Sequence, residues 1–169
     1  HNLFTNSKNW QTVFEQFNNS QIKIKWDGWQ FDQNSTASDG EAVKNISVTY
    51  SNKFKISWQY DGVNKNYVRY INGLKDSDSF GRDIVTNNIL IQYVYTQVLD
   101  SQGRLELSTI GNKEARVLKL GKMIRGNWKK DSVGQRTKFY DANNNQINLI
   151  PGKTWVMVVP DSVILRVGN

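Results

Sequence analysis

Residues 45–60, NISVTYSNKFKISWQY, alternate apolar and polar side chains on both sides of a short turn. Ile46, Val48 and Tyr50 alternate with serine and threonine, and the second half repeats the pattern with Phe, Ile, Trp and Tyr. A period of two residues is typical of a strand with one buried face. We therefore predict an antiparallel hairpin that turns at residues 51–53 and buries an aromatic-rich face.

The same rhythm continues to the end of the chain, with turn signals such as Asn72-Gly73 recurring roughly every 8–12 residues. The run 88–99 is long, β-branched and aromatic, and we predict a central strand that is buried on both faces at its start. Further strands are predicted at 67–71, 105–110, 115–120, 123–129, 138–140, 146–149, 154–159 and 163–167. The pattern predicts a mainly β fold, an antiparallel sandwich or a partly open barrel of meanders.

One amphipathic helix is predicted near the N-terminus. Trp10, Val13, Phe14 and Phe17 fall at helical spacing, so they share one face, which we expect to pack on the core, with a ligand groove as the alternative. Residues 22–26 alternate like a short strand, and residues 32–41 hold no large apolar side chain, which is typical of a linker. We therefore predict that residues 1–40 form the tail of an upstream domain and that residues 41–169 form the β domain.

Composition excludes several kinds of site. The 169 residues contain 22 Lys+Arg, 15 Asp+Glu, one His and no Cys, and the net charge is +7. The absence of Cys excludes disulfides, thiolate metal ligands and cysteine nucleophiles, and a single His excludes a multi-histidine metal site within the chain. The sequence contains no run of about 18 apolar residues, so it predicts no membrane span. No hydrolase, phosphate-loop or dinucleotide motif is present, so the sequence favours a non-catalytic protein and predicts no metal site or cofactor.

A basic cluster surrounds Trp128. If the strands that carry it are neighbours, they form a basic face with an exposed ring, which attracts phosphates by charge and sugars or bases by stacking. Teichoic acid, anionic lipid head groups and, less favoured, nucleic acid are then candidate ligands. The alternatives are a solvated face that discourages pairing between sheet edges, and core positions for Trp128 and Trp155. The cluster consists of Lys119, Lys122, Arg125, Lys129, Lys130, Arg136 and Lys138.

Other polar residues have structural and functional interpretations. Arg69 and Arg104 each stand near a turn that holds an Asp (Asp61 and Asp100), and we predict that they brace these turns, with ligand binding as the alternative. The carboxylates of residues 76–83 could bind Ca²⁺ or act on a glycan, but they lack the order of a calcium loop and are ordinary turn residues. His1 is a weak candidate for a general base, against a local packing role.

Several segments resemble the C-terminal domain of the YerB-like lipoprotein family, which is built from two domains of unknown function. They are 100–104 (DSQGR), 120–129 (LGKMIRGNWK), 136–141 (RTKFYD) and 147–155 (INLIPGKTW), and residues 1–5 (HNLFT) are similar to a segment late in the family's N-terminal domain. The resemblance implies that this chain is the C-terminal part of a longer, exported protein. It also implies a lipid anchor on an upstream Cys, and it brings no established reaction.

Three functional hypotheses follow. The first is a non-catalytic, envelope-associated module that binds an anionic envelope polymer or a protein partner through the basic face. The second is a wall-acting enzyme whose site is shared with the upstream domain, in a cleft lined by His1, Arg69 and an Asp of residues 76–83. The third is a scaffold for protein assembly that presents a strand edge or an apolar patch.

Overall fold

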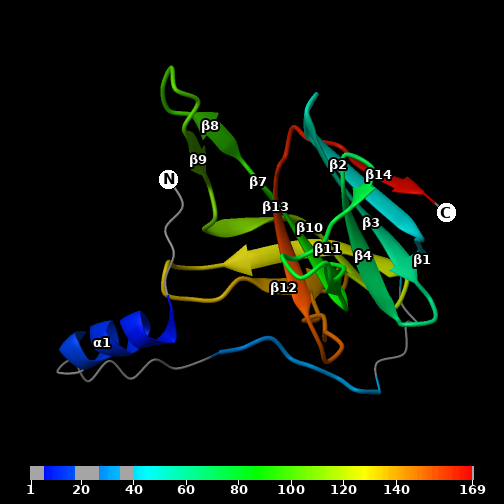
Figure 1. The fold of residues 1–169 in the computed structure, drawn as a ribbon, viewed down its shortest axis with the longest axis horizontal. Helices are drawn as coiled ribbons and strands as arrows, with labels where there is room; N and C mark the ends of the chain where they lie inside the picture. The colour runs from blue at the N-terminus through cyan, green and yellow to red at the C-terminus, as the bar shows by residue number, and fades with distance from the viewer. Residues whose placement is uncertain (1–5, 18–26, 35–39, 169) are drawn as a thin grey trace.

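The computed structural model describes residues 6–17, 27–34 and 40–168. They form one helix, α1 (Ser7–Phe17), and strands that belong mainly to two six-stranded sheets facing each other (Figure 1). The helix lies where the periodicity predicted it, and the mainly β fold is confirmed. The strand predicted at 22–26 lies outside the described residues.

One sheet, here called the antiparallel sheet, has the order β14-β2-β3-β4-β5, with β6 beside β4. The predicted first hairpin is confirmed, because Ile46 pairs with Trp58 and Val48 with Ile56. The β4–β5 turn is Asn72-Gly73, and both residues have positive φ, as the tightest two-residue hairpin turn requires. Its strands are β2 (Asn45–Ser51), β3 (Phe54–Asp61), β4 (Asn66–Ile71), β5 (Leu74–Lys75), β6 (Val85–Thr86) and β14 (Leu165–Gly168).

The other sheet, here called the mixed sheet, has the order β1-β11-β10-β7-β13, with β12 beside β11. Every pair in it is antiparallel except β7 and β13, which run parallel from Asn88 and Thr154 to Val94 and Pro160. Strand β7 is central and buried on both faces at its start, as predicted. Its strands are β1 (Glu41–Ala42), β7 (Asn88–Val94), β10 (Gly111–Lys119), β11 (Lys122–Lys130), β12 (Lys138–Asp141) and β13 (Thr154–Pro160).

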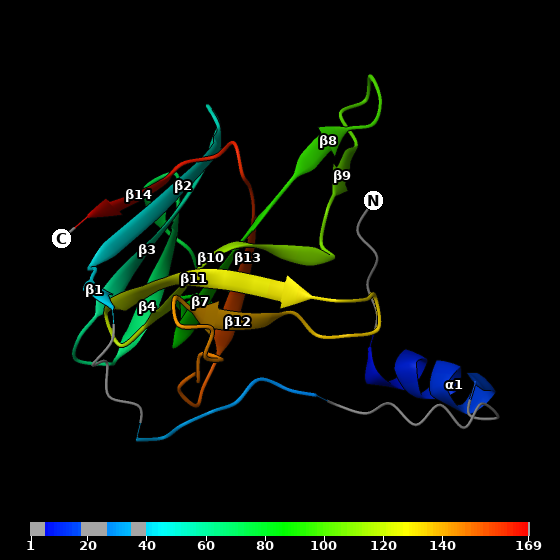
Figure 2. The same cartoon turned by 180° about the vertical axis from the view of Figure 1, so that it is seen from behind.

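Two strand predictions need correction. The run 88–99 is not one strand: β7 ends at Val94, and β8 (Thr96–Val98) pairs with β9 (Leu105–Leu107) in a separate hairpin. This projecting hairpin extends away from both sheets (Figures 1 and 2). Apolar alternation marks a strand but does not tell where the strand leaves its sheet. Residues 146–149 form isolated bridges instead of the predicted strand.

Strand β7 contributes to two cores because its alternate residues face opposite ways. Ile89 and Ile91 pack between the two sheets, in a core that also holds Trp58 and Met157. Leu90 and Val94 pack on the outer face of the mixed sheet, in a second core with residues such as Trp128, Phe139 and Leu149. The described strands therefore form a sandwich with open edges and not a closed barrel.

A buried amide fixes the chain where it enters β13. The side chain of Asn88 is fully buried, and its Nδ2 donates to the carbonyl of Ile150 at 2.8 Å. Its Oδ1 accepts from the backbone N–H of the same residue at 3.0 Å. This pair of hydrogen bonds holds residues 150–154 against the start of β7 and so aligns the parallel strands.

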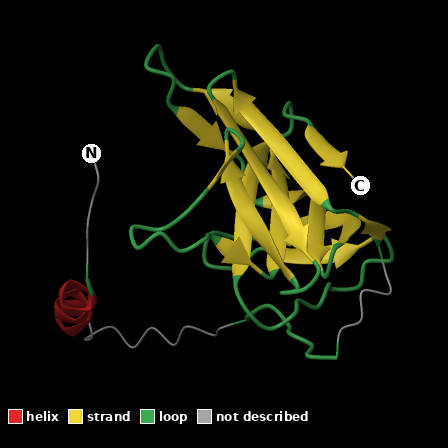
Figure 3. Ribbon diagram, turned by 45° about the vertical axis from the view of Figure 1, so that its right-hand side comes forward, coloured by secondary structure: helices red, strands yellow, loops and turns green. Residues whose placement is uncertain are grey.

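The expected docking of the helix on the core is wrong for the described side chains. Trp10 is 62% exposed and Val13 is 44% exposed. Figure 3 shows α1 standing apart from the strands. The helical period identifies an apolar face but contains no information about the surface that covers it.

Candidate functional site

The predicted basic cluster does not form one face. Successive residues of β11 point to opposite sides of the mixed sheet, so Lys122 and Lys130 share the side of Trp128, whereas Arg125 and Lys129 point to the other side. Trp128 is only 1% exposed, and its indole N–H donates to the carbonyl of Tyr93 at 2.6 Å. The prediction that the Trp128 ring is exposed is therefore wrong, and the alternative, a core position for Trp128, is confirmed.

Most of the remaining cations in this cluster already contact other groups. Arg125 pairs with Glu41 at 2.9 Å, and Lys138 pairs with the carboxylate of Asp27. Further contacts of the cluster are the Lys129–Asp131 pair at 3.6 Å, the stacking of Arg136 on Trp29 at 4.8 Å, and the hydrogen bond from Lys119 to the carbonyl of Asn148 at 2.7 Å. These contacts join neighbouring segments of the fold, and they occupy five of the seven cations of the cluster.

Arg69, Arg104 and Trp155 have well-defined surroundings. Arg104 pairs with Asp100, whose pKa lies below its usual value mainly because of that side-chain hydrogen bond. Arg69 pairs with Asp76 and not with Asp61, the carboxylate expected from the sequence. The Arg69 guanidinium lies 4.7 Å from the centre of the Trp155 ring, which is partly exposed.

The carboxylates of residues 76–83 are held separately. Asp76, Asp78 and Asp83 pair with Arg69, Arg82 and Lys75 respectively. In the described part of the chain, no group of three or more His, Cys, Asp or Glu side chains is placed to hold a metal ion. His1 lies outside the described residues, so the cleft predicted for the wall-acting enzyme remains a prediction.

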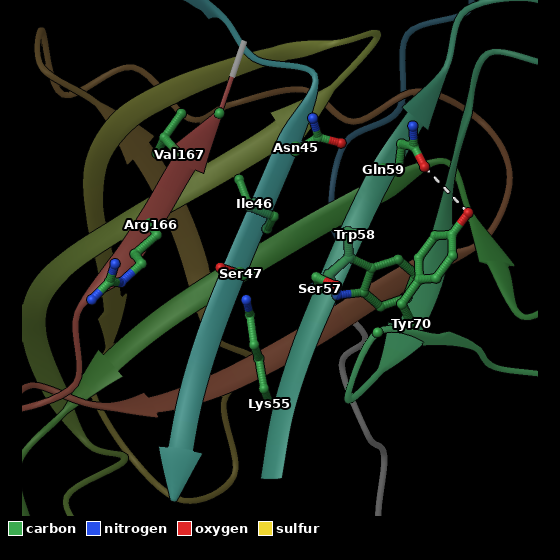
Figure 4. A pocket seen from close by; sticks show the side chains of 12 residues that line it. Asn45, Ile46, Ser47, Lys55, Ser57, Trp58, Gln59, Tyr70, Arg166 and Val167 are labelled. Atoms are coloured by element: carbon green, nitrogen blue, oxygen red, sulfur yellow. Dashed lines mark hydrogen bonds between the residues drawn. The ribbon is translucent and has the colours of Figure 1, made fainter. Parts of the chain in front are cut away.

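A polar groove that the sequence did not indicate crosses the outer face of the antiparallel sheet (Figure 4). Four residues at one register level lie side by side on four strands, because Arg166 pairs with Ser47, Ser47 with Ser57, and Ser57 with Tyr70. Directly paired residues point to the same face of a sheet. The two small serines therefore form a floor between the longer Arg166 and Tyr70, about 14 Å apart at three strand spacings.

Longer polar side chains complete this groove, which has a volume of about 390 Å³. Lys55 and Gln59 flank Ser57 along β3, and all three side chains point to the same face of the sheet. The hydroxyl of Tyr70 is 3.2 Å from Oε1 of Gln59, which fixes the orientation of the phenol ring. The remaining lining residues are Asn45, Ile46, Trp58, Gly73, Val167 and Gly168.

The groove suits an anion that also carries hydroxyl groups. Its lining contains two basic residues, Lys55 and Arg166, and no acidic residue. In the described residues, neither cation has an ion pair and neither serine hydroxyl has a hydrogen bond. Sequence reasoning missed this site because its parts lie on β2, β3, β4 and β14, and only the strand register brings them together.

Together the two sheets and the groove define a β-sandwich domain with an open polar groove on one outer face. The chain belongs to the family described as "Protein of unknown function (DUF3048) C-terminal domain", whose model matches residues 46–156. This result confirms the family resemblance seen in the sequence. None of the described residues forms a helix long and apolar enough to cross a membrane.

Two comparisons with Bacillus subtilis proteins agree with this family. The curated protein named "Putative lipoprotein YerB", from strain 168, is 25% identical over 133 residues, which cover 76% of this chain and 39% of that protein. The crystal structure of the YerB protein has a TM-score of 0.73 and 21% identity, and the match covers 96% of this chain and 54% of that chain. The chain therefore spans only part of its relatives' length, and the structural match supports the fold alone.

Proposed function

We propose that this domain is a non-catalytic module that binds an anionic, hydroxyl-bearing polymer of the cell envelope in the groove of the antiparallel sheet. The observation that carries this proposal is the pair of cations, Lys55 and Arg166, above a floor of serine hydroxyls with no acidic residue in the lining. The name of the Bacillus subtilis relative supports an extracytoplasmic setting with an upstream lipid anchor.

This proposal keeps the ligand class expected from the sequence but moves the binding surface. Three cations of β11 and β12, Arg125, Lys129 and Lys138, are paired with carboxylates, so these three attract a polyanion weakly. The cations of the groove are not neutralised, and Tyr70 adds a ring on which a sugar or polyol can lie. Charge attraction at an exposed site is screened by salt, so binding should weaken sharply as the salt concentration rises.

Isothermal titration with polyglycerol phosphate, at low and at high salt, tests the proposal. The double variant Lys55→Gln/Arg166→Gln should bind at least about tenfold more weakly at low salt, since each charge-assisted contact contributes on the order of 1.5 kcal/mol. The matched control is Lys65→Gln/Lys130→Gln, which removes the same charge from other strands and turns. Equal losses of affinity in the two double variants would contradict the proposal. An affinity that does not change with the salt concentration would contradict it as well.

The projecting hairpin favours protein assembly as a second candidate function. Val98, Leu105 and Leu107 lie on one face of it and are 61%, 54% and 43% exposed. A lone two-stranded hairpin is marginally stable in water, and a clustered apolar face is typical of a contact surface. A two-fold axis through this face would bring the same three residues of two copies together, so a second copy of the chain is the partner we propose.

Sedimentation velocity over a range of protein concentrations tests this second candidate. The wild-type chain should self-associate as the concentration rises, and Leu105→Ser/Leu107→Ser should remain monomeric. Val63→Ser/Ile164→Ser is the matched control, because these two apolar side chains are also highly exposed but lie elsewhere. A wild-type chain that stays monomeric at every concentration would remove the self-assembly function.

A further inference from the structure

A second pocket lies between the segment 78–86 and the beginning of β13. Its volume is about 610 Å³, and it shares no lining residue with the groove of the antiparallel sheet. Trp155 forms its aromatic wall, and the polar side chains around it come from both segments. The full lining is Asp78, Arg82, Asp83, Ile84, Val85, Thr86, Lys153, Thr154 and Trp155.

The Trp155 ring is held firmly in place. The Trp58 ring packs against it with centroids 5.3 Å apart and planes at 62°, and the Arg69 guanidinium lies 4.7 Å from its centre. Arg69 is itself fixed by Asp76, and the side chains of this ion pair are only 13% and 21% exposed. Turning the indole would disturb these contacts. The ring is therefore already oriented before a ligand arrives, and it loses little conformational entropy on binding.

The polar groups of the pocket are also fixed before a ligand arrives. Oδ1 of Asp78 accepts from the backbone N–H groups of Phe80 and Arg82, and its Oδ2 accepts from Nε of Arg82 at 2.8 Å. These hydrogen bonds hold the pKa of Asp78 below its usual value, with the Arg82 side chain as the largest cause. Asp83 is held by Lys75 at 3.1 Å. Asp78 is thus oriented and ionised in the neutral range or above, and Asp83 is oriented by its ion pair.

Charge decides which ligand this pocket suits. The two carboxylates of Asp78 and Asp83 balance the two cations of Arg82 and Lys153, so the lining has no net charge. Because the lining is balanced, neither a cation nor a phosphate gains a net charge attraction there, and either would lose hydration on entry. A neutral molecule avoids that cost of desolvation.

We infer that the Trp155 pocket binds the neutral ring of a saccharide, with a C–H face on the indole and hydroxyl groups on the fixed carboxylates and cations. A hydroxyl both donates and accepts, so it matches a lining where carboxylates accept and Lys153 and Arg82 donate. One apolar wall with a few placed polar groups is the usual make-up of a small-molecule site. This site stands independently of the proposed anion groove.

Titration of the ¹⁵N-labelled chain with cellobiose, maltose and N,N′-diacetylchitobiose tests the inference. The indole N–H signal of Trp155, assigned with Trp155→Phe, should move with at least one of these sugars. Asp83→Ala should weaken that binding about tenfold or more, because it removes a charged acceptor. Lys153→Met removes a donor and should weaken it as well. Asp161→Ala, which removes another ion-paired surface carboxylate, and Arg166→Gln, which alters the groove, should leave it unchanged.

Three results would overturn the inference. One is a Trp155 signal that no tested sugar moves. Another is a shift that persists unchanged in both Asp83→Ala and Lys153→Met. The last is tighter binding of glucose 6-phosphate or glucosamine than of the neutral sugars, which would show that charge governs this site. Because Arg166→Gln acts on the groove alone, failure here is distinguishable from failure of the proposed anion binding.

Discussion

The backbone N–H of Gly121 donates a hydrogen bond of 3.0 Å to the hydroxyl oxygen of Tyr67. Gly121 lies in the β10–β11 turn of the mixed sheet, and Tyr67 lies on β4 of the antiparallel sheet, so this bond joins the two layers. Tyr67 is 1% exposed, and the Tyr60 ring packs against it with centroids 5.1 Å apart. One corner of the sandwich is closed by these three residues.

Gly121→Ala should destabilise the domain more than Gly73→Ala does. Both glycines have positive φ, so both variants bear backbone strain. A Cβ at Gly121 would lie 2.6 Å from Cε1 of Tyr60, whereas a Cβ at Gly73 would meet nothing within 4 Å. We expect a difference of about 2 kcal/mol between the two variants in the free energy of unfolding, measured with urea. Equal losses of stability in the two variants would contradict the close contact between Gly121 and the Tyr60 ring.

Burial of the Tyr67 hydroxyl should make the fold sensitive to alkali. The pKa of Tyr67 is raised mainly by burial, so above about pH 10 the unfolded chain loses this proton while the folded chain keeps it. The contribution of Tyr67 to stability is therefore constant below that pH and falls as the pH rises beyond it. Tyr67→Phe should be about 1–2 kcal/mol less stable at pH 8, because the Gly121 N–H loses its acceptor, but its decline above pH 10 should be shallower. Urea titrations from pH 8 upward measure both effects, and parallel declines would contradict this account.

Asn88→Ala should cost about 3 kcal/mol of stability, because it leaves both backbone groups of Ile150 without their side-chain partners in a buried place. Asn143→Ala is the control, since Asn143 lies in the exposed turn after β12. Chemical denaturation compares the two variants with the wild type. An Asn88→Ala chain as stable as the control would show that the buried amide does not align β7 with β13.

Trp10→Ala should leave the stability of the domain within about 0.5 kcal/mol of the wild type, because Trp10 is mostly exposed on α1. Trp29→Ala should cost about 2 kcal/mol, because its ring packs on the second core and its Nε1 donates to the carbonyl of Thr137 at 2.8 Å. Thermal unfolding distinguishes them. A large loss in Trp10→Ala would place the helix against the strands.

Local signals predicted much of this fold. The alternation in residues 45–60 and the Asn72-Gly73 turn fix their hairpins through neighbouring residues alone. The parallel pairing of β13 with β7 and the departure of the chain at Tyr95 depend on distant contacts, which no local pattern encodes. The candidate site shows the same limit. Charges close in sequence, such as Arg125 and Lys130, point to opposite faces, whereas Ser47 and Arg166 become neighbours only through strand pairing.

The pairing of β14 with β2 and of β13 with β7 also determines when the domain can fold. A ribosome makes β2 and β7 long before it makes their final neighbours, so the edges of both strands stay open during most of synthesis. The mixed sheet lacks β13 until Pro160 has emerged, the antiparallel sheet lacks β14 until Gly168 has emerged, and contacts of such long range form slowly. The edge of β2 therefore stays unpaired until residues 165–168 have been made, and deletion of those residues would leave that edge permanently exposed.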